Sequence, residues 1–89
     1  MKIRYTKQFK KDYKRVKKQK KDLVRIKTVI KLLAAGQTLD PSYLDHPLTG
    51  NWNNHRDCHI EPDWILIYRK TESEIILERT GSHSELFKK

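Results

Sequence analysis

The sequence has 89 residues, of which 36% are hydrophobic and 35% charged, and this length allows a single domain over residues 1–89 with one small core. No apolar run is long enough to cross a bilayer and the N-terminus lacks a signal-peptide pattern, so we expect a cytoplasmic protein without a membrane partner. The net charge of +9 favours a polyanionic or acidic partner, and the single cysteine excludes an intramolecular disulfide and a cysteine-rich metal site.

The first predicted elements are a strand and a helix. Residues 2–5 alternate polar and apolar side chains, which is typical of a short strand. Thr6 is suited to cap a following helix, because its hydroxyl can accept a hydrogen bond from a free backbone N–H. Phe9, Tyr13 and Val16 then recur at helical spacing and share one face. The pattern predicts a strand that leads directly into an amphipathic helix.

A second helix is predicted to start near Asp22 and to stop at Gly36, a residue that tolerates the left-handed conformation common after helices. The junction at residues 19–21 is short, so the two helices should form an antiparallel hairpin. We expect this hairpin to cover one face of a sheet. The apolar stripe available for that contact consists of Leu23, Ile26, Val29, Ile30, Leu32 and Leu33.

Positive charge is concentrated in the same region. Residues 1–36 contain fourteen Lys or Arg and two Asp, a net charge of +12, whereas residues 37–89 carry a net charge of −3. A merely solvated helix face would also be rich in lysine, but the size of this excess favours a surface that holds the backbone of a large RNA. The lysines of the first helix that we expect to bind RNA are Lys10, Lys11, Lys14, Lys17 and Lys18.

The second half of the chain is predicted to form an ordered loop and then three antiparallel strands. Proline, glycine and short polar residues place the loop at residues 37–53. Tight turns separate the strands, which are predicted at residues 54–60, 64–69 and 74–80. An uninterrupted apolar run marks the second of them as a central strand buried on both faces. With a last helical turn capped by Ser82, the fold class is α+β: an N-terminal strand, an antiparallel helical hairpin, a three-stranded antiparallel meander and a short C-terminal helix.

Side chains that can transfer protons or carry charge lie at the ends of these predicted strands and in the adjoining loops. Metal-independent RNA cleavage needs such groups: a base for the ribose 2′-OH, an acid for the leaving 5′-oxygen and a cation for the phosphate. An aromatic side chain, Trp64 or Phe87, can stack on an unpaired base. We expect no metal and no cofactor. The candidate catalytic residues are His46, His59, Asp63, Arg79 and His83.

Structural roles are alternatives for several of these residues. Arg79 can form a surface ion pair with Glu78 or Glu61. Trp64 taken alone is more typical of a core, and Asp63 is typical of a turn. A zinc site formed by three histidines and Asp63 is a further alternative, but the sequence lacks the ligand spacing of known zinc motifs.

Strand alternation leaves the position of Arg79 open. Strict alternation places Asp57 and His59 on one face of their strand. In the last predicted strand, at residues 74–80, strict alternation groups Arg79 with Ile75 and Leu77 on an apolar face. Arg79 therefore reaches an open site only if its strand contains a bulge or if the strand end twists away.

Two long motifs in the second half resemble the YafQ family of bacterial type II toxins, within the RelE/ParE superfamily. They are HxEPDWxLxY at residues 59–68 and ERTGxHxxLF at residues 78–87. The segments Asp45-His46-Pro47-Leu48 and Gly50-Asn51-Trp52 add to the resemblance. The first half of the chain is similar to the family in pattern, as a strand followed by a lysine-rich helical pair.

The resemblance implies a RelE-like microbial RNase fold and a ribosome-dependent mRNA endonuclease that needs no metal. It also implies a cognate DinJ/RelB-like antitoxin that neutralises the enzyme. The expected partners are that antitoxin, the ribosome and mRNA, with DNA bound only indirectly through the antitoxin complex. By position, the resemblance assigns the active site to His46, His59, Asp63, Trp64, Arg79, His83 and Phe87.

Within this implied site we assign His83 as the general acid and His59 or Asp63 as the general base. His46 would position the phosphate, and Arg79 would stabilise the charge of the transition state. The two aromatic residues would shape a pocket for a base.

Two other classes of protein share part of these features. A ParE-like toxin has the same fold but inhibits gyrase by binding to it. A non-catalytic ribosome- or RNA-binding module would use only the basic helices. The dense set of His, Asp and Arg favours the enzyme, because a binding protein has no need of proton-transfer groups.

Overall fold

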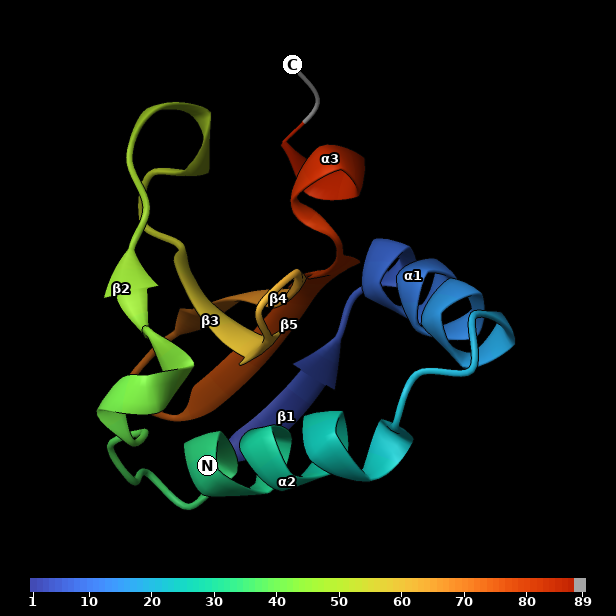
Figure 1. The fold of residues 1–89 in the computed structure, drawn as a ribbon. Coiled ribbons are helices and arrows are strands. Elements are labelled where there is room, and N and C mark those ends of the chain that lie inside the picture. Colours follow the sequence, from blue (N-terminus) through green and yellow to red (C-terminus); the bar gives the residue numbers. More distant parts are fainter. Residues whose placement is uncertain (88–89) are drawn as a thin grey trace.

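A five-stranded sheet forms the centre of the computed structural model, which describes residues 1–87 (Figure 1). The strand order is β1-β5-β4-β3-β2, with β1 parallel to β5 and the other neighbours antiparallel. The α+β class, the β3–β4–β5 meander and the short final helix are confirmed. The elements are β1 (Lys2–Tyr5), α1 (Lys7–Lys18), α2 (Leu23–Ala34), the 3₁₀ turn η1 (Pro41–Tyr43), β2 (His46–Pro47), the 3₁₀ turn η2 (Gly50–Trp52), β3 (Arg56–Glu61), β4 (Trp64–Lys70), β5 (Glu74–Gly81) and α3 (His83–Leu86).

Both long helices begin and end where the sequence predicts. The Thr6 hydroxyl accepts a hydrogen bond from the Phe9 N–H at 3.1 Å, and α1 follows directly. The Asp22 carboxylate accepts one from the Val24 N–H at 3.0 Å and caps α2. Gly36 has a φ of +73° just after α2, which lets the chain turn away at little cost.

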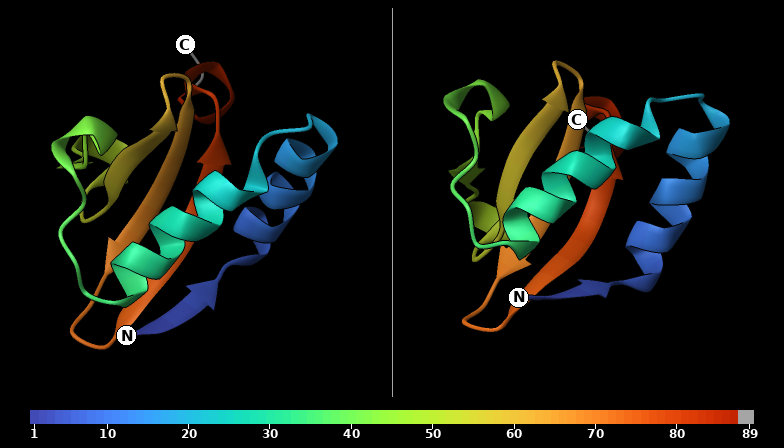
Figure 2. Two further views of the ribbon diagram at one scale, coloured as in Figure 1. Left: turned by 60° about the horizontal axis from the view of Figure 1, so that its bottom comes forward. Right: turned by 90° about the horizontal axis from the view of Figure 1, so that it is seen from below.

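The two helices form an open V (Figure 2). They diverge from their short junction, because α1 packs along β5 while α2 crosses above β3 and β5. Each helix thus uses its apolar stripe on a different part of the sheet. Within residues 1–87, no helix has the length and apolarity that a bilayer crossing requires.

The central strand β4 is buried on both faces, as predicted. Trp64, Leu66 and Tyr68 point into the larger core beneath the helices. Ile65 and Ile67 point to the opposite face, where they pack in a smaller apolar cluster. All five side chains are at most 1% exposed. A rigid, dry strand therefore supports whatever lies on the face away from the helices.

A bulge in β5 resolves the question of Arg79. Leu77 lies opposite Tyr68, but Arg79 lies opposite Ile67, so Glu78 is an extra residue in β5. The extra residue shifts the alternation by one position. Leu77 consequently faces the helical core, and Arg79 joins Ile67 on the other face.

Helix α1 continues the edge of the sheet where β1 stops. β1 ends at Tyr5, opposite Leu77, and leaves the last part of β5 without a strand neighbour on that side. The Asp12 carboxylate accepts a hydrogen bond from the Thr80 N–H at 3.2 Å. Arg15 donates to the Thr80 carbonyl at 2.7 Å. Two helix side chains therefore satisfy the strand groups that a neighbouring strand would otherwise bind.

Two features of the sheet were not predicted. β2 lies inside the segment predicted as a loop, and His46 pairs there with Asp57 of β3. β1 joins β5 in parallel, with Lys2 opposite Glu74. Both pairings join segments that are distant in sequence, and local patterns of polarity do not encode them.

Candidate active site

The face of the sheet opposite the helices carries the polar side chains. On β3, alternation sends Cys58 and Ile60 into the helical core. Asp57 and His59 alternate with them and point the other way. The neighbouring elements β2 and α3 bring two further imidazoles to the same face.

Three histidines from three different elements form a cluster. The rings of His59 and His83 lie 5.3 Å apart between centroids, with their planes at 63°. The rings of His46 and His59 lie 6.5 Å apart. His59 is therefore the central member, and the sheet brings together residues that the sequence separates. The fourth histidine, His55, lies outside the cluster and packs edge-on to Trp52 at 5.2 Å.

Asp63 holds His83 through two hydrogen bonds. The same carboxylate oxygen, Oδ1, lies 3.0 Å from the His83 backbone nitrogen and 2.7 Å from Nδ1 of its ring. The backbone bond, with the side-chain bond and the nearby charges, holds the pKa of Asp63 below its usual value. Because Nδ1 faces the carboxylate, Nε2 points elsewhere and has no hydrogen-bond partner within residues 1–87. This arrangement presents one nitrogen of an oriented imidazole to an incoming group.

The backbone around His83 is also fixed. Ser82 caps α3 by accepting from the Glu85 N–H at 3.2 Å. The Glu85 carboxylate accepts in return from the Ser82 N–H at 2.8 Å. This reciprocal pair is a capping box, and it sets the first turn of α3. His83 thus stands on a rigid turn at the end of β5.

Asp57 is a functional candidate that sequence reasoning missed. It is 3% exposed, and its Oδ1 lies 3.0 Å from Nδ1 of His46. That nitrogen makes its hydrogen bond with the Leu44 carbonyl at 2.7 Å, so within residues 1–87 Oδ1 of Asp57 has no hydrogen-bond donor. Burial raises the pKa of Asp57, although positive charge on His46, His59 and His83 acts against the rise. Its alternation with His59 placed it on the right face, but nothing local indicated that it is buried.

Arg79 is turned toward α1. Its Nε and Nη2 atoms bind the two carboxylate oxygens of Asp12 at 2.7 and 3.2 Å. The expected alternative partners, Glu78 and Glu61, instead pair with Arg69 and Arg25. No hydrogen bond joins Arg79 to the histidine cluster within residues 1–87.

Asp12 is a second residue that sequence reasoning missed. It is fully buried, and burial alone would raise the pKa of its carboxyl. Hydrogen bonds from Arg79, Gln8 and the Thr80 backbone outweigh that effect and hold the pKa below its usual value. The available signal was a lone acid next to the apolar stripe of a lysine-rich helix.

A pocket of about 520 Å³ lies beside the histidine cluster. It takes its walls from η2, β5 and the segment at α3, and Arg79 lies in one of these walls. Phe87 lines this pocket, and its ring lies 6.2 Å from the His83 ring between centroids. The pocket is lined by Asn51, Trp52, Arg79, Glu85, Leu86 and Phe87.

The prediction that Trp64 shapes a base pocket is wrong. Trp64 is fully buried in the core beneath the helices, and its indole N–H donates to the Thr80 hydroxyl at 2.9 Å. Its place at the start of β4 turns the side chain to the helical face. The core interpretation holds, and Trp52 is the tryptophan beside the candidate site.

The five lysines predicted to bind RNA are all exposed on α1. The opposite side of the helix is buried through Phe9, Asp12 and Val16. The basic face thus points away from the sheet, while the inner face of the same helix holds Arg79.

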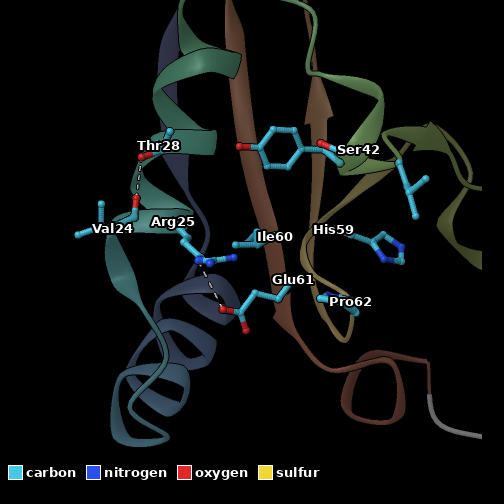
Figure 3. A pocket seen from close by; sticks show the side chains of 10 residues that line it. Val24, Arg25, Thr28, Ser42, His59, Ile60, Glu61 and Pro62 are labelled. Atoms are coloured by element: carbon cyan, nitrogen blue, oxygen red, sulfur yellow. Dashed lines mark hydrogen bonds and ion pairs between the residues drawn. The ribbon is translucent and has the colours of Figure 1, made fainter.

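A cavity of about 620 Å³ lies on the side of β3 that faces α2 and η1 (Figure 3). It opens between α2, η1 and the end of β3, and an ion pair of Arg25 with Glu61 at 3.7 Å lies within it. His59 lines its edge, and in Figure 3 the imidazole points away from Arg25. Within residues 1–87, no group of three or more His, Cys, Asp or Glu side chains has the arrangement of a metal site.

Comparisons with known proteins show which sequences and solved structures this chain is similar to. A model of the YafQ family, described as the bacterial toxin of a type II toxin–antitoxin system, matches residues 1–88. The mRNA interferase toxin YafQ of Escherichia coli K12 is 45% identical over 86 residues, which span 96% of this chain and 94% of that protein.

Solved structures show the same fold. The crystal structure of YafQ from E. coli BL21(DE3) has a TM-score of 0.93 and 44% identity, with 96% of each chain covered. YafQ in the E. coli DinJ–YafQ complex has a TM-score of 0.90 and 45% identity, again with 96% of each chain covered.

Proposed function

Because this chain belongs to the YafQ family of bacterial type II toxins, we propose that it is an mRNA interferase, an endoribonuclease that cuts mRNA on the ribosome. The observation that supports this activity best is the cluster of His46, His59 and His83, with Asp63 orienting the last of them. These groups can donate and accept protons at neutral pH without a metal or a cofactor.

Cleavage proceeds by attack of a ribose 2′-oxygen on the adjacent phosphorus. His59, at the centre of the cluster, takes the proton of the 2′-OH. The new bond from the 2′-oxygen to phosphorus forms as the bond to the 5′-oxygen breaks, and His83 gives that oxygen a proton through Nε2. The products are a 2′,3′-cyclic phosphate and a 5′-OH. Asp63 was an alternative base, but its bonds to His83 suit it better to orienting the acid.

The other site residues act on charge. His46 positions the phosphate from the far side of His59. Asp57 places a buried carboxylate next to the imidazoles, 3.0 Å from Nδ1 of His46, where it can help to orient that ring. Arg79 stabilises the transition state through the Nη1 side of its guanidinium, which Asp12 leaves unoccupied.

The lysines of α1 hold the ribosome through its RNA backbone. A cognate DinJ/RelB-like antitoxin holds the toxin inactive, as the DinJ–YafQ complex illustrates for a relative. DNA is contacted only through that antitoxin complex. We place the protein in the cytoplasm, where its ribosomal target is, and treat residues 1–89 as one toxin domain.

The test is to incubate the protein with translating ribosomes and map the mRNA ends. We expect new 5′-OH ends on ribosome-bound mRNA, none with free mRNA, and far fewer with a His83→Ala variant. Intact mRNA together with inhibited gyrase would overturn the proposal in favour of a ParE-like toxin. Intact mRNA on ribosomes that bind the protein tightly would indicate a non-catalytic binding module.

A further inference from the structure

We propose that Asp45 is a positioning residue: its carboxylate, fixed from the helical side of the sheet, sets the place of the His46 imidazole on the opposite side. Tyr68 and Arg56 are the two donors that fix this carboxylate, and the three residues are called the Asp45 clamp below. The inference rests on the proposed function, because His46 acts there on the phosphate.

The Asp45 carboxylate accepts two hydrogen bonds at one oxygen. The Tyr68 hydroxyl donates to Oδ1 at 2.8 Å, and Nε of Arg56 donates to the same atom at 3.2 Å. Tyr68 is 1% exposed and the Asp45 side chain 20% exposed, so water competes weakly for these bonds. Burial and the bond to Asp45 raise the pKa of Tyr68, so its hydroxyl remains a donor at neutral pH. Two strands of the sheet, β3 and β4, thus hold the clamp.

The clamp acts across the sheet because Asp45 and His46 are consecutive. Successive side chains of an extended segment point to opposite faces. Asp45 reaches Tyr68, whose ring lies in the core beneath the helices. His46 lies beside His59 on the other face. Fixing the Asp45 carboxylate therefore fixes the start of the His46 side chain through a single peptide unit.

The segment that carries His46 has little other support. β2 consists of two residues, and the second, Pro47, has no N–H to donate to a neighbouring strand. The cavity of about 620 Å³ lies between α2 and η1, and Ser42, Tyr43 and Leu44 line it (Figure 3). The Tyr43 ring packs on the core, but the Leu44 side chain is 57% exposed. Packing therefore supports this segment less than it supports the long strands.

The backbone just before His46 adopts a conformation that needs such support. Leu44 has a φ of +53° and a ψ of +37°, in the left-handed region that residues other than glycine rarely adopt. In this conformation its carbonyl lies 2.7 Å from Nδ1 of His46. A carbonyl only accepts, so Nδ1 carries the proton and Nε2 is the nitrogen left for the substrate. Release of Asp45 lets Leu44 relax, and the imidazole then loses its fixed tautomer and direction.

The first experiment observes the imidazole nitrogens of the free protein by two-bond ¹H–¹⁵N NMR, at a pH where the rings are neutral. We expect the His46 ring of the parent to be protonated at Nδ1. In Tyr68→Phe and Asp45→Ala it should move toward the mixture of tautomers of an unrestrained imidazole. Tyr43→Phe is the matched control, since it removes a tyrosine hydroxyl from η1 in the same segment and should leave the signal unchanged. A His46 signal that is the same in the parent and in both clamp variants would overturn the clamp.

Single-turnover cleavage of ribosome-bound mRNA gives the second readout. Asp45→Ala should lower the rate by up to about 10²-fold, the loss expected when a positioning group is misplaced by about 1 Å, with ribosome affinity unchanged. Tyr68→Phe keeps the buried ring and should lower the rate less, because Arg56 still holds Asp45. Circular dichroism checks the fold, and Tyr68→Phe carries both readouts if Asp45→Ala does not fold.

A double-mutant cycle with His46→Ala separates positioning from a merely structural role. Once His46 is absent, adding Asp45→Ala or Tyr68→Phe should change the rate by less than about twofold, because residues that act as a unit are not additive. A loss of the same size in both backgrounds would show that Asp45 acts without His46 and would overturn the proposal.

The two readouts also distinguish the clamp from the proposed function, because the NMR signal of His46 needs neither ribosome nor mRNA. If the clamp variants change the His46 tautomer but the parent never cuts mRNA, the proposed function is refuted and the clamp stands as a feature of the fold. If the parent cuts mRNA while His46 keeps its tautomer in both variants, the clamp alone is refuted.

Discussion

His83 depends for its setting on a residue twenty positions earlier. Asp63 lies in the turn between β3 and β4, and its carboxylate fixes both the backbone and the ring of His83. Both side chains are well exposed, so their removal should disturb chemistry more than folding.

We predict that His83→Ala lowers cleavage of ribosome-bound mRNA by about 10²- to 10⁴-fold, the usual contribution of one general acid. Single-turnover cleavage measures the rate, and circular dichroism checks the fold. Ser84→Ala is the control, because it alters an exposed side chain of the same short helix. If His83→Ala cuts mRNA within about threefold of the parent, another group is the acid, and His46 is the next candidate.

We predict that Trp64→Phe destabilises the fold by about 1–3 kcal/mol while cleavage by the folded protein is retained. The change removes the indole N–H that donates to the Thr80 hydroxyl and leaves a gap in a fully buried site. Urea unfolding measures the loss. Trp52→Phe is the matched control and should leave stability nearly unchanged. A Trp64→Phe variant that is as stable as the parent but cleaves more slowly would show that Trp64 acts in the active site.

Single residues also show where sequence reasoning reaches its limit. The motif that contains Trp64 marked it as a family residue but did not show which face of the sheet its side chain occupies. A shift of one position along a strand moves a side chain to the opposite face. Asp57 and Asp12 were missed for a related reason. Each is buried by elements distant in sequence, and burial is what makes a carboxylate unusual.

At the scale of elements, α1 has two separate tasks. Its outer face presents the lysines, and its inner face holds Arg79 and completes the edge of β5 through Asp12 and Arg15. Its start and its amphipathic pattern were predictable, because capping and periodicity are local. Its contact with β5 was not, because that contact depends on where β1 ends.

We predict that Asp12→Asn lowers the free energy of unfolding by about 1.5–3 kcal/mol at neutral pH, the usual value for hydrogen bonds to a charged group. The folded-state pKa of Asp12 lies below its usual 3.8, so the contribution is full above that value and is lost as pH falls through the folded pKa. The difference between parent and variant should therefore shrink in acid. Denaturant unfolding of both proteins from pH 7 to pH 3 measures this difference in free energy. A difference that stays constant over this range would contradict an ionised Asp12 in the folded protein.

We predict that reversing the charge of Lys10, Lys11, Lys14, Lys17 and Lys18 to Glu weakens ribosome binding and flattens its dependence on salt. Each lysine that neutralises a phosphate contributes to the slope of affinity against salt concentration. Co-sedimentation with ribosomes across a salt series measures this slope. Lys70→Glu, an exposed lysine at the end of β4, is the control. If the variant with all five lysines reversed binds ribosomes as tightly as the parent, α1 is not the docking surface.

At the scale of the whole molecule, basic and catalytic surfaces lie on different sides. The lysines of α1 point away from the sheet, and the histidine cluster lies on the face opposite the helices. The order of elements and the fold class were predictable from polarity patterns and turns. The assembly of the site was predictable only in part, since β2, the β5 bulge and α1 together decide which residues meet.

We predict that the antitoxin covers the basic face of α1, the histidine cluster, or both, with an acidic or amphipathic segment that folds on binding. Lysine acetylation of the complex and of the free toxin reports on α1. Hydrogen exchange of α3 reports on the region of His83. A neutralised complex in which both regions stay as accessible as in the free toxin would refute this.

The position of β5 also has a consequence during synthesis. β5 lies between β1 and β4, yet it leaves the ribosome after every other strand. A nascent chain that still lacks β5 cannot close its sheet or place Arg79 and His83, however early its helices form. Cleavage by a newly made chain therefore becomes possible only after β5 and α3 have been synthesised.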